Sequence, residues 1–292
     1  MKYIKYLESF QEMIRLRGLT DGTLRSYTTY LTTYLKYLEN ILGKDPEEVT
    51  WKDLREYIKW LEDTRHLSGR TINSIIAQLK FFFMYVLHKQ WEPTQLPMRK
   101  VDVYLPYVPS KRETIKFINS ITNLRLKAIV ALMYSSGMRI GEVCNLKVSD
   151  IDSENMRIHI RTSKNRNGRY AILSQNTLEL LRAYWRKYRG IEDYLFPRKN
   201  NIHLPEHTGT ITNMIHEHED SLGLERKFTC HTFRHAFGTH LYESGADLLE
   251  IKTLLGHKSI NSTVIYVHLA NKTLKHVISP FDSADGEFNV TY

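Results

Sequence analysis

The 292-residue sequence contains little cysteine and no long apolar run. Its two cysteines, Cys144 and Cys230, form no Cys-x-x-Cys pair, so they predict neither a disulfide framework nor a cysteine-rich metal site. Two reduced thiols are typical of a cytoplasmic protein. No apolar stretch of about eighteen residues is present, and charged residues interrupt the N-terminus where a signal peptide needs an apolar region. We therefore expect a cytoplasmic protein with no membrane partner.

A His-Glu-x-x-His motif is also missing, although His231, His235 and His240 stand close together in the sequence. Zinc hydrolases use this motif to combine two imidazole ligands with a carboxylate. Since no carboxylate accompanies these histidines in that arrangement, a metal-dependent hydrolase is a poor interpretation. We expect the protein to use no metal and no other cofactor.

Positive charge, in contrast, is abundant. The formal net charge is +9 and the isoelectric point is about 9.3. An excess of this size favours a polyanionic partner, and nucleic acid is the commonest such partner. Charge alone does not separate DNA from RNA or from an anionic membrane, and a solvated basic surface is the plainer explanation.

The chain is long enough for two domains. Apolar residues at helical spacing predict four helices with short connections between residues 1 and 90, which is the pattern of a small helical bundle. Their approximate ranges are 2–17, 22–42, 51–63 and 69–88. We expect helix caps at Asp21, Thr50 and Ser68. Core and rim packing is the expected role of the tyrosine row Tyr27, Tyr30, Tyr34 and Tyr37.

The stretch 91–110 breaks the helical pattern. Because proline removes an amide donor and restricts the residue before it, the stretch predicts an extended domain linker. Its prolines are Pro93, Pro97, Pro106 and Pro109. Arg99 and Lys100 within it could cross a nucleic acid backbone or could simply be solvated. A second domain is expected over 111–279 and a polar tail over 280–292.

The second domain is predicted to be mostly helical. Its helical patterns cover about 112–120, 123–136, 139–146, 175–188, 208–221, 232–244, 247–255, 259–267 and 271–278. Two alternating segments, 156–161 and 169–173, predict a β-hairpin with Lys164 near its tip. The fold class is therefore mainly α, with an N-terminal helical bundle and a mostly helical domain that carries a small β-hairpin or sheet. Expected caps are Ser174, Thr208, Asp247 and Ser259.

Several residues of the second domain suit chemistry on a phosphodiester. Negative charge builds up on the non-bridging oxygens of a phosphate under attack, and arginine and histidine can donate to these oxygens. A tyrosine can act as the nucleophile, and a lysine can protonate the leaving oxygen. The candidate catalytic residues are Arg139, Lys164, His231, Arg234, His257 and Tyr266.

Each candidate taken alone has a commoner structural explanation. Arg139 could pair with Glu142, and Tyr266 is one of 18 tyrosines that pack by default. A His-x-x-Arg match such as His231 with Arg234 arises by chance about once in a sequence of this composition. The inference therefore rests on the order and spacing of the whole set.

Taken together, these motifs resemble the tyrosine recombinase (phage integrase-like) family. The resemblance rests on Gly137-Met-Arg139-Ile-Gly-Glu142, a lysine hairpin, His231-Thr-Phe-Arg234-His235, Leu255-Gly256-His257 and Tyr266-Val-His268. It covers the second half of the chain densely and the first half weakly. Because no further domain precedes the helical bundle, we expect a compact Xer-like or transposon-borne member.

The resemblance implies a site-specific recombinase that acts on double-stranded DNA. The family's catalytic positions fall on the candidate residues listed above; Lys164 is matched by pattern only, and Arg166 and Arg169 lie near it in the sequence. Tyr266 would form a 3′-phosphotyrosyl link and leave a 5′-hydroxyl, and rejoining would need neither ATP nor metal. Family members clamp DNA between two domains, and four protomers act on two sites through a Holliday junction. In family members the helix after the tyrosine often docks on a neighbouring protomer, and here that helix would be about 271–278.

Two other functions share parts of this pattern. A type IB topoisomerase uses the same attack chemistry but relaxes supercoils without a partner duplex. A non-catalytic DNA-binding protein is the other alternative, and such a protein would be expected to have lost some of the candidate residues. All of them are present in this sequence, which favours an enzyme.

Overall fold

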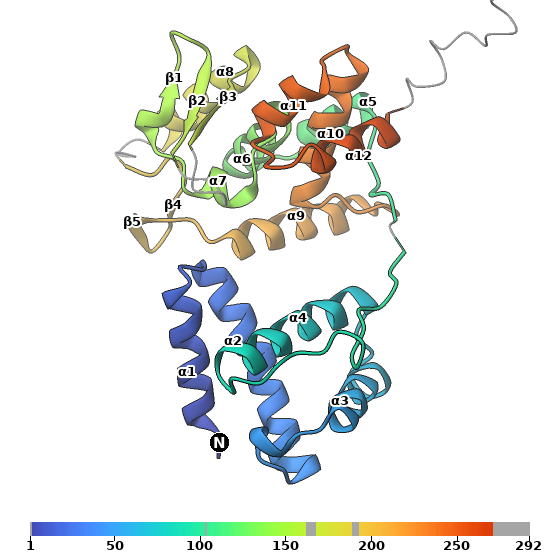
Figure 1. The fold of residues 1–292 in the computed structure, drawn as a ribbon. Helices are drawn as coiled ribbons and strands as arrows, with labels where there is room; N and C mark the ends of the chain where they lie inside the picture. The colour runs from blue at the N-terminus through green and yellow to red at the C-terminus, as the bar shows by residue number, and fades with distance from the viewer. Residues whose placement is uncertain (1, 103, 162–167, 189–192, 271–292) are drawn as a thin grey trace, which may run out of the picture. The chain divides into compact units, whose positions relative to one another are not determined.

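The structure, a computed structural model, describes residues 2–102, 104–161, 168–188 and 193–270. The chain divides into two compact units, Met1–Val103 and Tyr104–Tyr292, each with its own hydrophobic core. The described residues are mainly helical, with two small antiparallel sheets in the second unit (Figure 1). The expected fold class is therefore confirmed. Among the helices in these ranges, none is long and apolar enough to cross a membrane.

The first unit is built from amphipathic helices that share one core. They are α1 (Ile4–Leu16), α2 (Asp21–Tyr37), α3 (Trp51–Asp63) and α4 (Gly69–Tyr85). The expected caps Thr50 and Ser68 are confirmed, because each side chain accepts the backbone N–H three residues later. Asp21 is wrong as a cap. Thr20 accepts the corresponding N–H at the start of α2, and Asp21 is the first helical residue.

Aromatic side chains fill much of the first core. Tyr34 and Tyr37 are buried, and their ring centroids lie 5.1 and 4.9 Å from that of Tyr57. Core packing is thus confirmed as the role of these two members of the tyrosine row. Trp91 and Leu96, which belong to the proline-containing stretch, are buried in the same core. The chain therefore stays packed on the first unit for several residues beyond α4.

The second unit packs its helices around α6. The helices are α5 (Lys111–Ser120), α6 (Leu124–Ser135), α7 (Ile140–Cys144), α8 (Gln175–Lys187), α9 (Thr208–Leu222), α10 (Cys230–Glu243), α11 (Leu248–Leu255) and α12 (Asn261–Leu269). Buried residues follow one another along α6 from Ala128 to Met133. A helix that is apolar on all sides belongs in the centre of a domain, and α6 contacts α5, α7, α8, α9 and α10.

A three-stranded antiparallel sheet lies at one side of this unit. Its strands are β1 (Ile151–Asp152), β2 (Arg157–Ile160) and β3 (Arg169–Ile172), in that order. The pairing of β2 with β3 is confirmed, and its register sets Ile160 opposite Arg169. Strand β1 was not predicted from the sequence, because two residues are too short to show alternation. The small sheet of β4 (Pro197–Arg198) and β5 (Asn201–Pro205) was not predicted either.

Two helix starts in the second unit differ by one residue from the expected caps. Thr208 is wrong, because His207 precedes α9 and accepts a backbone N–H through its ring. Ser259 is wrong, because Ile260 precedes α12 and makes no side-chain cap. Errors of one residue are typical at helix ends, where the hydrogen-bond pattern changes gradually. The expected caps that are confirmed are Ser174 and Asp247.

The last three described helices form a second, smaller core. Its buried members are Phe237, Ile251, Leu255 and Tyr266, from α10, α11 and α12. Figure 1 shows these helices side by side, coloured orange to red. Since α11 also contacts β3, the helices and the sheet meet at α11. Residues that are far apart in the sequence therefore come together in this region.

Candidate active site

Arg139 lies at the N-cap of α7, directly after a tight turn. Gly137 in this turn has φ +61°, and an added Cβ would lie 2.3 Å from the Phe237 ring, so the turn requires glycine. The carboxylate of Glu142 accepts the backbone N–H and a guanidinium N–H of Arg139, both at 2.9 Å. The pairing of Arg139 with Glu142 that the sequence suggested is thus present in the structure. The arginine side chain nevertheless stays 26% exposed.

Arg234 lies on α10 and is buried. Its guanidinium donates to the backbone carbonyl oxygens of Gly137 at 2.5 Å and Leu255 at 2.6 Å. These bonds hold it between the turn before α7 and the end of α11. Burial, reinforced by the charge of Arg139, lowers the pKa of Arg234 to about 10. Both guanidinium groups are cationic at neutral pH, and their mutual repulsion would be relieved by an anion placed between them.

His257 follows Gly256, the left-handed residue that ends α11. Its Nδ1 lies 2.9 Å from the hydroxyl oxygen of Thr263, in the first turn of α12. Burial, followed by the charges of Arg234 and Arg139, lowers the pKa of His257 to about 4. The imidazole is therefore neutral at pH 7 and carries a single N–H.

Tyr266 lies on α12, and only 1% of it is exposed. Its ring packs on α10 at Gly238, where an added Cβ would lie 2.5 Å from Cζ, the carbon that bears the hydroxyl. The His257 ring is stacked with it at a centroid distance of 6.2 Å, and the His235 ring is tilted at 6.1 Å. Burial raises the pKa of Tyr266, and the charges of the two arginines oppose that rise. The phenol is thus protonated at neutral pH, beside cations that can stabilise its phenolate.

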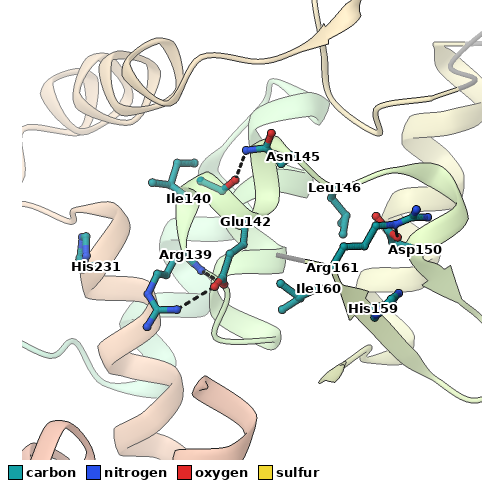
Figure 2. A pocket seen from close by; sticks show the side chains of 11 residues that line it. Arg139, Ile140, Glu142, Asn145, Leu146, Asp150, His159, Ile160, Arg161 and His231 are labelled. Carbon is teal, nitrogen blue, oxygen red and sulfur yellow. Dashed lines mark hydrogen bonds and ion pairs between the residues drawn. The ribbon is translucent and has the colours of Figure 1, made fainter. Parts of the chain in front are cut away.

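A pocket of about 360 Å³ opens at Arg139 and His231 (Figure 2). Arg139 and His231 line one part of it, and His159 and Arg161 line another. Figure 2 shows His231 on its helix to one side of Arg139, with the imidazole and the guanidinium at the same end of the pocket. His231 is exposed at the start of α10. The pocket therefore makes an arginine and a histidine accessible to a ligand from outside.

Lys164 lies outside the described residues, as does Arg166. The hairpin lysine therefore remains a prediction. Arg169, the other nearby arginine, has a side chain that is 9% exposed, and it donates to both carboxylate oxygens of Glu142 at 2.8 Å and to the Leu254 carbonyl at 2.9 Å. A guanidinium engaged in this way by the protein is poorly placed to bind a phosphate.

The described part of the chain contains both cysteines and several histidines and carboxylates. Within it, no group of three or more His, Cys, Asp or Glu residues is placed to hold a metal ion. Cys144 and Cys230 are buried free thiols. Burial raises the pKa of Cys144 to about 12 and also raises that of Cys230. Both thiols are therefore poor nucleophiles at neutral pH.

The structure brings five of the candidate residues to one region, from the start of α7, from α10, from the end of α11 and from α12. They are Arg139, His231, Arg234, His257 and Tyr266. The supporting parts played by His235, Gly238 and Thr263 were not predicted from the sequence. Helical spacing was the available signal for two of them, because His235 and Gly238 recur on the face of α10 that carries His231.

Comparison with known proteins identifies the family. Residues 111–273 match the phage integrase family, and residues 6–93 match the N-terminal SAM-like domain of phage integrases. The first match alone spans more than half of the chain. The chain belongs to the phage integrase family. It is a tyrosine recombinase, an enzyme of site-specific DNA recombination.

Two relatives illustrate how far the similarity of the recombinase extends. The putative integrase/recombinase y4qK of Sinorhizobium fredii is 34% identical over 276 residues, which cover 92% of this chain and 88% of the relative. The tyrosine recombinase XerA of Pyrococcus furiosus is 32% identical over 278 residues, which cover 93% of this chain and 92% of the relative. Both similarities span the two units, so the expected Xer-like character is confirmed.

Solved structures share the fold of the recombinase. A crystal structure of XerA recombinase matches at 28% identity with a TM-score of 0.53, covering 91% of this chain and 94% of that one. The Tn1549 transposon integrase, in complex with circular intermediate DNA, matches at 19% identity with a TM-score of 0.71, covering 89% and 94%. At 19% identity, the second match is evidence for the fold alone.

Proposed function

We propose that the recombinase cuts and rejoins DNA through a covalent bond between Tyr266 and a 3′-phosphate, and that it exchanges strands between two duplex sites. One observation carries this proposal. The phenol of Tyr266 lies beside His257 and close enough to Arg139 and Arg234 for both charges to act on its pKa. A nucleophile surrounded by donors of positive charge suits attack on an anionic phosphodiester.

In the proposed reaction, the two arginines donate to the non-bridging oxygens of the phosphate. The hydroxyl oxygen of Tyr266 forms a bond to phosphorus as the phenol gives its proton to a water molecule. The bond to the 5′-oxygen breaks, and its electron pair stays on that oxygen, which takes a proton from Lys164. The products are a 3′-phosphotyrosyl link and a 5′-hydroxyl. A 5′-hydroxyl from the partner duplex reverses the step, and the bond energy is conserved.

His257 has a defined part in this proposal. Its Nδ1 faces the Thr263 hydroxyl at 2.9 Å, and its lowered pKa leaves it neutral. If Thr263 donates to Nδ1, the single proton of the ring lies on Nε2. That N–H is then free to donate to a phosphate oxygen as charge develops there. His231, exposed at the pocket, is proposed as a second donor from the other side.

The two units are proposed to divide the work. The first, over residues 1–90, grips the duplex, and the second, over residues 111–279, carries the chemistry. The match of the first unit to the SAM-like domain of phage integrases supports this division. So do the exposed cations Arg25, Arg70 and Lys80. Phosphate contacts of this kind weaken steeply as the salt concentration rises.

Assembly on DNA completes the proposal. We propose that four copies act on two sites and that segment 271–278 docks on a neighbouring protomer. This segment lies outside the described residues. Its support is the helical spacing of Leu274, Val277 and Ile278 in the sequence. Sedimentation of the protein with one and with two DNA sites tests the number of copies.

A covalent adduct is the decisive test. The target site is first located by identifying the DNA that becomes covalently attached to the protein in its own organism. A nicked duplex with the sequence of that site then traps the covalent adduct. Tyr266→Phe should form no adduct and should bind the same duplex as the wild type does. Tyr242→Phe is the matched control, since Tyr242 packs against the same small core. Adduct formation by Tyr266→Phe would overturn the proposal.

Relaxation of supercoiled plasmids separates the recombinase from a topoisomerase. The recombinase should join two cognate sites and relax an unrelated plasmid weakly. Strong relaxation of any plasmid, together with failure to recombine paired sites, would favour the topoisomerase alternative. The relatives named as recombinases, at 30% identity or more across both units, favour recombination.

A further inference from the structure

Arg169 does not belong to the proposed catalytic set, but its side chain makes several hydrogen bonds in the same region. It begins β3, and its side chain is only 9% exposed. Three of its contacts reach other parts of the unit. Two go to the carboxylate of Glu142 on α7, and the third goes to the backbone at the end of α11. A long cation buried to this degree needs partners, and these partners are the scaffold of the site.

The contact with Glu142 concerns Arg139 directly. One Glu142 oxygen accepts from Nη1 of Arg169 at 2.8 Å and from the guanidinium of Arg139 at 2.9 Å. The other accepts from Nη2 of Arg169 at 2.8 Å and from the backbone N–H of Arg139 at 2.9 Å. The carboxylate, 5% exposed, is thus shared between the two arginines.

Because Glu142 is shared by the two arginines, the group of three side chains keeps a net positive charge that can attract an anionic ligand. Glu142 alone would neutralise Arg139, and a neutral ion pair attracts phosphate weakly. With Arg169 present, two guanidinium groups balance one carboxylate, and one positive charge is left over. Because the side chain of Arg169 is 9% exposed while that of Arg139 is 26% exposed, that charge is available at Arg139.

The contact of Arg169 with α11 affects the positions of Arg234 and His257. The Nε of Arg169 donates to the Leu254 carbonyl at 2.9 Å, and the next carbonyl, that of Leu255, accepts from Arg234 at 2.6 Å. The stem of Arg169 also lies against Gly256, where an added Cβ would be 2.8 Å from its Cδ. His257 follows at once, so the same turn carries the acceptor of Arg234 and the imidazole.

We infer that Arg169 is a positioning residue that sets the charge and orientation of Arg139, Arg234 and His257 without touching DNA. The inference rests on the proposed function of that site. It explains how strand β3, helix α7 and the end of α11 are kept in register around one phosphate. It also assigns different roles to two cations of the same hairpin, with Lys164 proposed to meet the substrate and Arg169 to hold the site.

Single-turnover cleavage of the nicked duplex tests the inference. Arg169→Met should bind DNA like the wild type and should form the adduct about a hundredfold more slowly, because misplacement of catalytic groups by about 1 Å costs that much. Arg169→Lys keeps the charge but loses the bidentate hydrogen bonds to Glu142, so its rate of adduct formation should lie between those of the wild type and Arg169→Met. Arg157→Met is the matched control. Arg157 lies on the adjacent strand, pairs with Asp152 at the surface and should be dispensable for cleavage.

A second substitution separates positioning from simple loss of folding. If Arg169 acts by sharing Glu142, then Glu142→Gln in the Arg169→Met background should release Arg139 and restore the rate about tenfold. A structural defect would instead be made worse by the second change. Thermal unfolding by circular dichroism compares the folding of each variant.

Three outcomes would overturn the inference. They are wild-type cleavage rates in Arg169→Met, equal losses in Arg169→Met and Arg157→Met, or a further loss on adding Glu142→Gln. If Arg169→Met does not fold, Arg169→Lys decides, and a wild-type rate there counts against the inference. Absence of any adduct with the wild-type protein would refute the proposed function, and the inference with it. An adduct that is insensitive to Arg169 refutes the inference alone.

Discussion

At the scale of single residues, the site depends on how a few polar groups divide their hydrogen bonds. Glu142 shows this well. Burial alone raises the pKa of its carboxyl, but the hydrogen bonds and charge of Arg169, followed by those of Arg139, outweigh burial and hold the pKa below its ordinary value. The carboxylate therefore stays charged at neutral pH and can orient both guanidinium groups.

Thr263 is the residue whose hydroxyl is proposed to donate to Nδ1 of His257, 2.9 Å away, and so to place the ring proton on Nε2. Thr263→Val removes that donor while keeping the shape of the side chain. We expect the rate of adduct formation to fall about tenfold, the value of one hydrogen bond of about 1.4 kcal/mol. Binding to DNA should not change. Thr263→Ser keeps the hydroxyl and should cleave at close to the wild-type rate, so equal rates for the two variants would contradict this role of Thr263.

At the scale of elements, α10 organises the site. His231, Arg234, His235 and Gly238 recur at intervals of three and four residues, which places them on neighbouring positions of one helical face. The first turn of this face reaches the pocket through His231, and the second turn carries Arg234, which donates to backbone carbonyl oxygens of other elements. Further along, the face packs against the Tyr266 ring at Gly238. The capping box formed by Thr229 fixes where the helix begins and therefore where each group lies.

The contact between α10 and α12 leaves no room for a larger residue at Gly238. Gly238→Ala places a Cβ 2.5–2.7 Å from the Tyr266 ring, and overpacking of this kind costs about 1–3 kcal/mol. We expect a lower melting temperature, and slower adduct formation because the ring is displaced from His257. Gly22→Ala is the control, because its Cβ would meet nothing closer than 3.9 Å. An unchanged melting temperature in Gly238→Ala would show that α12 is not held by this contact.

At the scale of the whole molecule, the two units have separate hydrophobic cores. The first unit is held largely by aromatic contacts between its helices. The second holds several partly or fully buried groups that titrate in weak acid. Its stability should therefore depend on pH more strongly than that of the first unit.

The histidines beside Tyr266 give the direction of that dependence. Burial is the main cause that lowers the pKa of both His235 and His257 to about 4, from an ordinary value of 6.5. Between pH 6.5 and 4 the unfolded chain binds protons that the folded chain does not bind. The contribution of these histidines to stability is therefore complete above pH 6.5 and is lost as the pH falls toward 4.

Thermal unfolding at pH 7.5 and at pH 5.0 measures this effect. The wild type should lose more of its melting temperature on acidification than the double variant His235→Gln/His257→Gln. His203→Gln, at an exposed histidine, should behave like the wild type. If acidification lowers the melting temperature equally in the wild type and the double variant, the two histidines are not the source of acid sensitivity.

The sequence by itself determined the helical character of the chain, the β2–β3 pairing and the family. Periodicity and capping residues are local signals, and the motifs around Arg139, Arg234, His257 and Tyr266 are short and ordered. Only the tertiary structure decided that Glu142 is shared by two arginines, that Arg169 faces the protein and that Gly238 supports the Tyr266 ring. The contact of Arg169 with Glu142 and that of Gly238 with Tyr266 join residues that lie 27 and 28 positions apart. Sequence patterns do not predict contacts between residues so far apart, because these contacts depend on how the helices and strands pack together.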